Sequence, residues 1–282
     1  MNQNKFPLAV IILTLNEETN LAGALDSAVA WADQVFVVDS FSTDKTLEIA
    51  KKYKADIYQN RWVDWATQRN WALDNLPIDN EWILFLDADE RVSPELACEI
   101  QEMLQAASSE VGGFYINRKF IFMGRWLRHG GLYPNFILRL VRKGKSRVHM
   151  IGAWEYFKIE GETLRLKNCI VHNDQKQLTH WIDKHNQYAD KEAKATYKKN
   201  FDIKIEQKGE LERKRQIQYR RYVWMKLPLL FRSLFLYFVR YVILRGFLDG
   251  KEGLIYYFLC SFWYPFLVDA KILEIRSKGM EK

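Results

Sequence analysis

The first third of the chain alternates short apolar runs with segments of helical periodicity, and this alternation restricts the fold more than any other feature. Residues 8–15 (LAVIILTL) are apolar without a break and rich in β-branched side chains, as in a strand buried on both faces of a parallel sheet. The pattern recurs at residues 35–38, 55–58 and 82–86, with helical periodicity between the runs at 21–32, 43–53 and 65–76. Alternating strands and helices predict an α/β fold with a parallel, doubly wound sheet flanked by helices.

Two of the predicted helices have recognisable start signals. Ser42 and Thr43 are available to cap the helix over 43–53. A further helix opens at Ser93-Pro94-Glu95, which combines a capping serine with a proline in the first turn.

After Gly113 the composition of the chain changes. Aromatic and basic residues predict loops over 120–136. The glycines within 129–134 would allow that segment to close over a substrate, with a plain surface loop as the alternative. Strands are predicted at 137–142, 156–159 and 169–172, followed by a helix at 178–197. Residues 200–216 form a charged stretch, and an apolar, aromatic region begins at Tyr222.

Charge and hydropathy limit the kinds of partner. Of the 282 residues, 48% are hydrophobic and 27% are charged, which is typical of a globular protein. The net charge of +7 predicts attraction to anions, and six basic residues within 213–226 lead directly into the apolar region. This order favours a lipid surface over nucleic acid.

The late apolar region does not predict a membrane span, which needs about 20 largely uncharged residues. Arg232, Arg240 and Arg245 interrupt residues 224–247, and residues 254–268 are too few and contain a proline. Amphipathic helices lying in the membrane interface explain this pattern, with an ordinary packed helical subdomain as the alternative.

The cysteines and the start of the chain indicate the compartment. Cys98, Cys169 and Cys260 are scattered and lack the spacing of zinc or redox motifs, so we expect reduced thiols. The apolar run at 8–15 is too short for a signal peptide. These features together predict a cytoplasmic protein.

Polar side chains follow three of the predicted strands. Asn16 and Glu17 follow the first, Asp39 follows the second, and Asp87-Ala88-Asp89 follows the run at 82–86. Ligands bind at the carboxyl ends of parallel strands, so these groups are expected to meet at one edge of the sheet. Neither a glycine-rich dinucleotide motif nor a P-loop is present. The two aspartates offer hard oxygen ligands for a Mg²⁺ or Mn²⁺ that bridges a diphosphate, with capping of a turn as the alternative reading.

Four motifs, ILTLNEE, VVDSFSTDKT, QRNWAL and WILFLDADER, together resemble the family 2 glycosyltransferases with the GT-A fold. The motifs GGLYPNFILRL and HWIDKHNQYA and residues 246–272 resemble the branch for lipopolysaccharide core or exopolysaccharide biosynthesis, so the resemblance covers nearly the whole chain. It implies a GT-A domain over 1–199, with a nucleotide-sugar half (1–112) and an acceptor half (113–199). Residues 200–282 would form a membrane-associating extension of basic linker and interfacial helices.

The resemblance also implies roles for individual residues. Asp39 would accept a hydrogen bond from the nucleotide base, for which uridine fits best, and Asp89 would hold Mg²⁺ or Mn²⁺. The metal and Arg69 would neutralise the charge that grows on the departing diphosphate. The implied donor-binding residues are Thr14, Asn16, Glu17, Asp39, Arg69 and Asp87.

Inversion in a single displacement needs a base for the acceptor hydroxyl. Glu155 is the first candidate, because the aromatic side chains of AWEYF would raise its pKa by desolvation and because it aligns with a glutamate of this branch. Arg139 is interpreted as facing a phosphate or an acidic acceptor, or as lying on a solvated strand edge. His172 lacks metal-site spacing to nearby carboxylates and is interpreted as structural or as part of the acceptor side. Competing candidates for the base are His129, His149 and Asp174.

These observations predict an inverting glycosyltransferase that moves a hexose from a UDP-sugar to a hydroxyl of a membrane-associated glycan. The acceptor would be lipopolysaccharide core or a lipid-linked exopolysaccharide precursor, and the enzyme would lie peripherally on the inner face of the cytoplasmic membrane. A polyprenyl-phosphate glycosyltransferase, a nucleotidyltransferase and a non-catalytic membrane adaptor are the alternatives. Nucleic acid is not an expected partner.

Overall fold

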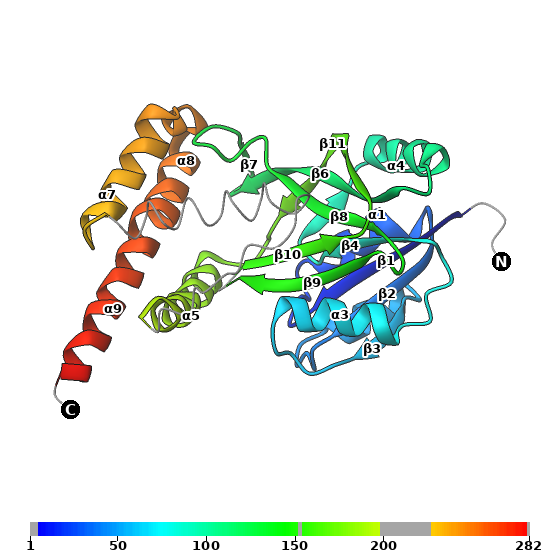
Figure 1. The fold of residues 1–282 in the computed structure, drawn as a ribbon, viewed down its shortest axis with the longest axis horizontal. Helices are drawn as coiled ribbons and strands as arrows, with labels where there is room; N and C mark the ends of the chain where they lie inside the picture. Colours follow the sequence, from blue (N-terminus) through cyan, green and yellow to red (C-terminus); the bar gives the residue numbers. More distant parts are fainter. Residues whose placement is uncertain (1–4, 152–153, 198–226, 281–282) are drawn as a thin grey trace. The chain divides into compact units, whose positions relative to one another are not determined.

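The computed structural model describes residues 5–151, 154–197 and 227–280 (Figure 1). These residues belong to two compact units, which are treated in turn. Of the described residues, the first unit comprises 5–126, 133–150 and 155–176, and the second comprises 127–132, 151, 154, 177–197 and 227–280.

The first unit is built on one mixed sheet with the strand order β3-β2-β1-β4-β8-β6-β11-β5, and β7 pairs with β6. The parallel part consists of β1 (Phe6–Thr14), β2 (Ala32–Asp39), β3 (Asp56–Gln59) and β4 (Trp82–Asp87). The remaining strands are β5 (Glu90–Val92), β6 (Val111–Phe122), β7 (Arg125–Leu127), β8 (Phe136–Arg142) and β11 (Glu162–Asn173). β8 is antiparallel to β4 and β6, whereas β6 and β11 are parallel. The predicted α/β fold with a mostly parallel sheet is confirmed.

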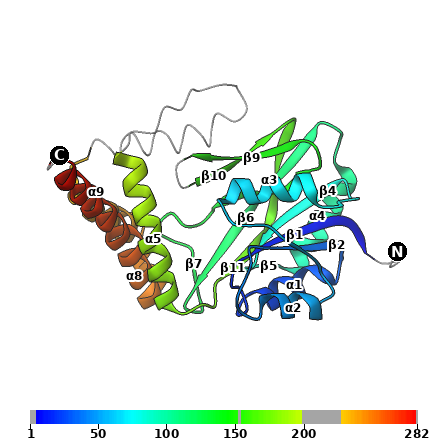
Figure 2. The same cartoon turned by 90° about the horizontal axis from the view of Figure 1, so that it is seen from below.

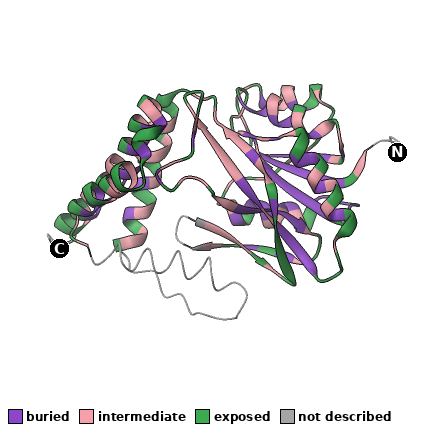
Figure 3. Ribbon diagram, turned by 90° about the horizontal axis from the view of Figure 1, so that it is seen from above, coloured by how far each residue is buried: buried purple, intermediate pink, exposed green. Residues whose placement is uncertain are grey.

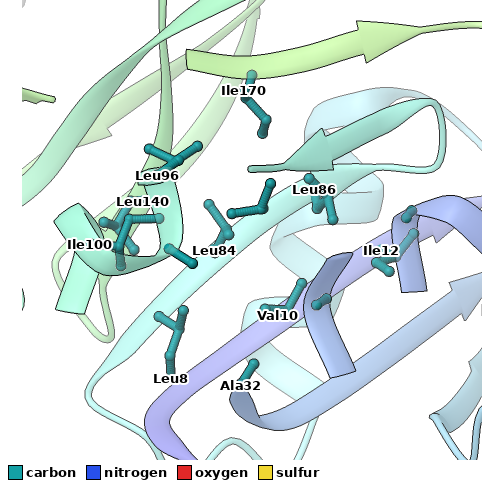
Figure 4. Close-up of a cluster of buried hydrophobic side chains, with 14 of the residues drawn as sticks. Leu8, Val10, Ile12, Ala32, Leu84, Leu86, Leu96, Ile100, Leu140 and Ile170 are labelled. Atoms are coloured by element: carbon teal, nitrogen blue, oxygen red, sulfur yellow. The ribbon is translucent and has the colours of Figure 1, made fainter. Parts of the chain in front are cut away.

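Both faces of β1 are buried, as its unbroken apolar run predicts. Leu8, Val10 and Ile12 point into one core cluster, and the residues between them point into a second cluster on the other face (Figures 3 and 4). Helices α1 (Leu21–Val29) and α4 (Pro94–Ala106) contribute to the first cluster, and α3 (Trp65–Asn75) contributes to the second. Figure 2 shows α1 and α3 on opposite sides of the sheet. Each fully buried leucine or isoleucine contributes roughly 1.5–3 kcal/mol.

One of the two predicted helix starts is confirmed and the other is wrong. Ser93 caps α4, accepting a hydrogen bond from the Leu96 amide at 3.2 Å, with Pro94 following it. Helix α2 (Thr46–Lys52) has no side-chain cap. Ser42 and Thr43 instead bind the loop after β1. The backbone N–H of Asn16 in that loop donates a hydrogen bond to Ser42 Oγ, and Asn16 Oδ1 accepts one from the backbone N–H of Thr43.

Strand β6 was not predicted, because the glycine pair at its start signals a break. Gly112 is required by packing: a Cβ there would lie 2.2 Å from the carbonyl oxygen of Glu160. β6 pairs with β8 and β11, so its partners come from distant parts of the chain. A separate hairpin of β9 (Ser146–Ile151) and β10 (Trp154–Ile159) completes the strands of the described residues.

The second unit is helical. Helix α5 (Leu178–Tyr197) packs against α9 (Tyr264–Met280) through Ala189, Ala193, Val268 and Ile272. α5 falls within the predicted acceptor half (113–199), and in the structure it belongs to the same compact unit as the C-terminal helices. The predicted boundary at 199/200 and the charged stretch after it lie outside the described residues.

Between α5 and α9 in sequence, the described part of this unit contains α7 (Phe231–Phe238), η1 (Val239–Ile243), η2 (Gly246–Asp249), α8 (Gly250–Tyr257) and η3 (Phe258–Trp263). None of the helices within residues 5–151, 154–197 and 227–280 has both the length and the apolar character needed to cross a bilayer.

The loop Leu127–Leu132, which contains the first four residues of the segment 129–134 that was predicted to move over a substrate, is held by hydrogen bonds to these helices. Asp249 accepts hydrogen bonds from the amides of Arg128 and His129, and its Oδ1 lies 2.6 Å from His129 Nδ1. Tyr257 donates its hydroxyl to the His129 carbonyl at 2.7 Å. A Cβ on Gly130, where φ is +58°, would lie 2.4 Å from the Tyr257 ring, so this close approach requires glycine.

Candidate active site

The strand ends meet at one edge of the sheet, as predicted. In register, Leu13 of β1 lies beside Asp87 of β4, and Thr14 lies beside Asp39 of β2. The groups that follow these three central strands are therefore neighbours on the carboxyl edge, where ligands of open α/β sheets bind.

Asp39 is buried beneath this edge, and its carboxylate holds the surrounding residues in place through hydrogen bonds. Its Oδ1 accepts hydrogen bonds from the hydroxyls of Thr14 and Ser42, and its Oδ2 accepts from the Ser42 amide at 2.9 Å and from Gln59 at 3.3 Å. A carboxylate has about four acceptor sites, so these four bonds occupy it. Direct contact of Asp39 with a base, as the resemblance implies, would require Ser42 or Gln59 to move.

The loops above Asp39 are held in uncommon backbone conformations. Asn16 and Phe41 have φ values of +54° and +62°, and Phe41 exposes its ring at the end of β2. Such conformations are uncommon for side chains other than glycine and are concentrated at functional sites. Phe41, which was not among the predicted site residues, presents an aromatic face beside the predicted nucleoside position.

Glu17 anchors the loop after β1 to the end of β11. Its Oε1 lies 2.6 Å from Lys176 Nζ, and Asn20 donates to both Glu17 and Asp174. Burial raises the pKa of the Glu17 carboxyl, although Lys176 opposes the shift, and the negative charge of Asp89 adds to it. Glu17 and Asp89, predicted at separate strand ends, thus lie close enough to interact.

Asp87 lies in a cluster of two arginines and three carboxylates. Arg69, which is 1% exposed, reaches Asp87 through Nη2 and Glu155 through Nε, each at 2.9 Å. Arg139 of β8 also pairs with both carboxylates, and it lies 3.4 Å from the fully buried Glu90. Arg139 therefore belongs to the site and not to a solvated strand edge.

This cluster shifts the protonation of its carboxyl groups in opposite directions. Burial alone would raise the pKa of Asp87, but Arg139 and Arg69 more than offset it and hold that pKa below its usual range. Burial raises the pKa of Glu90, and Asp87 adds to the shift while Arg139 opposes it. The cluster favours an ionised Asp87 at the edge and a Glu90 that holds its proton more tightly behind it.

The surroundings of Glu155 differ from the expected aromatic pocket. Two guanidinium groups, rather than apolar rings, contact its carboxylate: Arg69 on Oε2 at 2.9 Å and Arg139 on Oε1 at 3.2 Å. The side chain remains 22% exposed. Glu155 thus positions both arginines, and its role as a base stays a prediction.

The competing candidates for the base lie in different settings. Asp174 is held by Asn20 and by the Lys176 amide. His149 is exposed and stacks on Tyr156 in the β9–β10 hairpin. His129 belongs to the second unit, where it pairs with Asp249.

Asp89 and His172 together fit a divalent metal. His172, at the end of β11, places Nδ1 3.2 Å from Asp89 Oδ1 and stacks its ring on Phe120. This buried Nδ1 forms no hydrogen bond with any residue that the structure describes. Within those residues no group of three or more such side chains could hold a metal. Asp89 would supply the carboxylate oxygen that Mg²⁺ or Mn²⁺ prefers, His172 would supply a nitrogen that suits Mn²⁺ better than Mg²⁺, and the remaining ligands would have to come from the donor diphosphate and water.

Arg118 of β6 is a second residue that the sequence did not indicate. Its charge opposes the rise in the pKa of Glu90 that burial causes, so it lies near the cluster. Its buried Nε has no hydrogen-bond partner within the described part of the chain. Phe120, two positions along the same face of β6, stacks on His172. Arg118 and His172 come from strands whose pairing no local pattern reveals, so local sequence signals could not have identified them.

Comparison with known proteins adds three findings. The sequence profile described as Glycosyl transferase family 2 matches residues 9–163, more than half of the chain. An uncharacterized glycosyltransferase of Rickettsia conorii is 40% identical over 94 residues, which make up 33% of this chain and 33% of that protein. The lipopolysaccharide core biosynthesis glycosyltransferase LpsC of Rhizobium meliloti is 32% identical over 148 residues, 51% of this chain and 53% of LpsC. The chain therefore spans a third to about half of the length of these relatives.

A solved structure agrees with the fold. Mannosyltransferase PcManGT from Pyrobaculum calidifontis, in complex with GDP-Man and Mn²⁺, has a TM-score of 0.53 with 13% identity. The alignment covers 95% of this chain and 87% of that one. At this identity the likeness concerns the fold alone.

Proposed function

The chain belongs to glycosyltransferase family 2, and from that premise we propose that it is an inverting hexosyltransferase. It transfers a hexose from a UDP-sugar to a hydroxyl of a membrane-associated glycan at the inner face of the cytoplasmic membrane. The relative LpsC supports lipopolysaccharide core as the acceptor, with a lipid-linked exopolysaccharide precursor as the other member of this acceptor class. The observation that carries the proposal is the Asp89–His172 pair, which lies beside the Asp87 cluster at the carboxyl edge.

Asp89 and His172 would hold the Mg²⁺ or Mn²⁺ that the family uses, and Asp87 would face the ribose. When bound, the metal supplies positive charge to the diphosphate. Asn16 and Glu17 line the same edge, and the buried Thr14 and Asp39 hold its loops in place. We propose that Phe41 stacks on the nucleotide base.

Arg118 is the better candidate for neutralising the leaving diphosphate. Arg69, to which the resemblance gave this role, already faces two carboxylates. Within the described residues both guanidinium groups have a buried nitrogen without a hydrogen-bond partner, Nε in Arg118 and Nη1 in Arg69. A guanidinium whose charge is not already balanced by two adjacent carboxylates, however, offers more net attraction to an incoming anion. Arg69 would then keep Asp87 ionised and oriented.

The reaction would be one displacement at the anomeric carbon. The acceptor oxygen forms its bond to that carbon as the bond to the diphosphate oxygen breaks, and the bonding electrons leave with the diphosphate. The acceptor proton passes to the partly exposed Glu155 carboxylate, which retains acceptor capacity beyond its two arginine contacts.

Thermal shifts of the full chain with UDP-hexoses, GDP-mannose and CMP, each with and without Mn²⁺, test the donor site. A ligand at about 100 times its Kd stabilises the folded state by about 2.7 kcal/mol. We expect a metal-dependent rise in Tm with one UDP-hexose, and its loss in Asp89→Asn and His172→Ala.

The matched control is Asp74→Asn, whose carboxylate is half-exposed and pairs with Arg147 on the surface. This variant should keep the full shift. A shift that survives in both Asp89→Asn and His172→Ala would contradict the metal site, and the absence of any nucleotide response would contradict the proposed function.

A further inference from the structure

Helix α7 is oriented with its polar side chains inward and its apolar side chains outward. Arg232 and Ser233 are buried, and Arg232 donates from Nε to Asp269 of α9 at 2.8 Å. On the opposite side Phe231 is 73% exposed, Leu234 56% and Phe235 58%, followed by Phe238. The spacing i, i+3, i+4, i+7 places these four side chains on one helical face. A helix surrounded by water has the reverse orientation.

The exposed apolar surface continues beyond α7 to the turn between η1 and α8. Ile243, Leu244, Phe247 and Leu248, here called the tip, are each more than 40% exposed. Exposed large apolar side chains in this number, all within residues 231–248, indicate a site of interaction with another protein or with a membrane.

Hydrogen bonds hold the backbone of the tip in place, so its apolar side chains are exposed as part of the folded structure. Leu244 accepts a hydrogen bond on its carbonyl from the Gly130 amide at 2.9 Å. Asp249, 2% exposed, accepts from the His129 amide at 3.0 Å, and its Oδ2 also lies 3.0 Å from the Tyr257 hydroxyl oxygen. These bonds hold η2 and the start of α8 behind the apolar side chains.

The charges around the tip have one sign at the surface. Arg245 and Lys251 are exposed, and so is Arg128, whose amide donates to Asp249. Within residues 227–263 the acidic side chains are Asp249 and Glu252, which are 2% and 14% exposed. Arg128, Arg245 and Lys251 therefore face solvent, whereas the two acidic side chains of this range are mostly buried.

We propose that the α7 face and the tip dock this unit onto a bilayer that contains anionic lipids. Apolar side chains would enter the boundary between headgroups and acyl chains, while Arg128, Arg245 and Lys251 contact headgroup phosphates. The combination of exposed apolar and basic residues favours an anionic lipid surface over a neutral protein surface. The inference rests on the second unit alone and does not depend on the donor site of the first.

Co-sedimentation of the full chain with phosphatidylcholine vesicles, with and without phosphatidylglycerol, tests the docking surface. We expect tighter binding to the anionic vesicles. Phe235→Glu with Phe247→Glu should weaken it by about tenfold or more, because charged side chains disfavour insertion. Arg245→Asn with Lys251→Gln should weaken it by about 25-fold, since each basic residue near an anionic surface contributes about fivefold. High salt should reduce this second effect.

The matched control is Leu164→Glu, which places a charge at an exposed apolar position of β11 in the first unit and should bind vesicles as the native chain does. Every variant should keep its Tm and its nucleotide-dependent thermal shift, so failure to dock is separable from failure of the donor site. Absence of native binding to anionic vesicles would overturn the proposal. So would a dimer in solution that Phe235→Glu with Phe247→Glu dissociates, because it would assign the surface to a second copy of the chain.

Discussion

Replacement of Arg69 by alanine should destabilise the first unit severely, because it removes a buried guanidinium shared by two carboxylates. Arg69 donates to Asp87 and to Glu155 at 2.9 Å each, and hydrogen bonds to charged groups contribute about 1.5–3 kcal/mol apiece. Its guanidinium also lies 5.0 Å from the centre of the Phe85 ring, so truncation leaves a void beside an aromatic side chain.

The net loss is smaller than the sum of these contributions, because Arg139 continues to pair with both carboxylates. Breaking a buried ion pair by removal of one partner costs about 3–5 kcal/mol, and we expect a value near 4 kcal/mol. For a unit of this size that corresponds to a fall in Tm of about 8–16 °C.

The assay is urea unfolding of the native chain, Arg69→Ala and Arg147→Ala. Arg147 pairs with Asp74 at 2.6 Å, but both side chains are about half exposed, so its truncation should lower stability by less than about 1 kcal/mol. Arg69→Lys should give an intermediate loss, since an ammonium cannot reproduce the two-pronged contact. If Arg69→Ala were as stable as Arg147→Ala, the reasoning would be refuted.

Three further predictions follow from the same edge of the sheet. Asp39→Asn should lower the free energy of unfolding by roughly 1–3 kcal/mol, because the side-chain NH₂ group of asparagine would face the donors of Ser42 and Gln59. Urea unfolding identical to that of the native chain would contradict the stabilising role of the Asp39 carboxylate. Glu155→Gln should lower kcat by about 100-fold or more with little change in KM if Glu155 is the base, whereas a loss below about tenfold would leave it a positioning residue. Because the folded-state pKa of Glu90 is raised, its carboxyl stabilises the fold while protonated, and this contribution is lost as pH rises from about 4.3 through the folded pKa. Glu90→Gln should therefore gain stability relative to the native chain over that rise, and a pH-independent difference between the two would contradict the assignment.

The periodicity of the sequence predicted β1, β2 and β4 and the polar groups that follow them. A strand buried on both faces must be continuously apolar, and a parallel sheet must bring its carboxyl ends to one edge, so Asp39 and Asp87 could be placed before any coordinates. The same local rules found α3 and the capped start of α4.

The periodicity of the sequence did not predict which strands, far apart in the chain, are neighbours in the sheet. The ends of β11 and of β4 lie far apart in sequence, and only the path of β11 through the sheet brings His172 to Asp89. The partners of Glu155 are a second example, since its sequence neighbours are aromatic whereas its spatial neighbours are two arginines. Charge pairing across a fold depends on which strands are adjacent, and periodicity carries no information about that.

The sequence by itself determined the layers of the fold, the edge where the donor would bind and the amphipathic character of the late helices, because these follow from the spacing of apolar residues along a local element. Only the tertiary structure decided which face of α7 is covered. The buried Arg232–Asp269 pair turns its polar side inward and leaves Phe231 and Phe235 exposed. Which side of a helix or strand is buried depends on its neighbours, and the tertiary packing of the whole chain determines those neighbours.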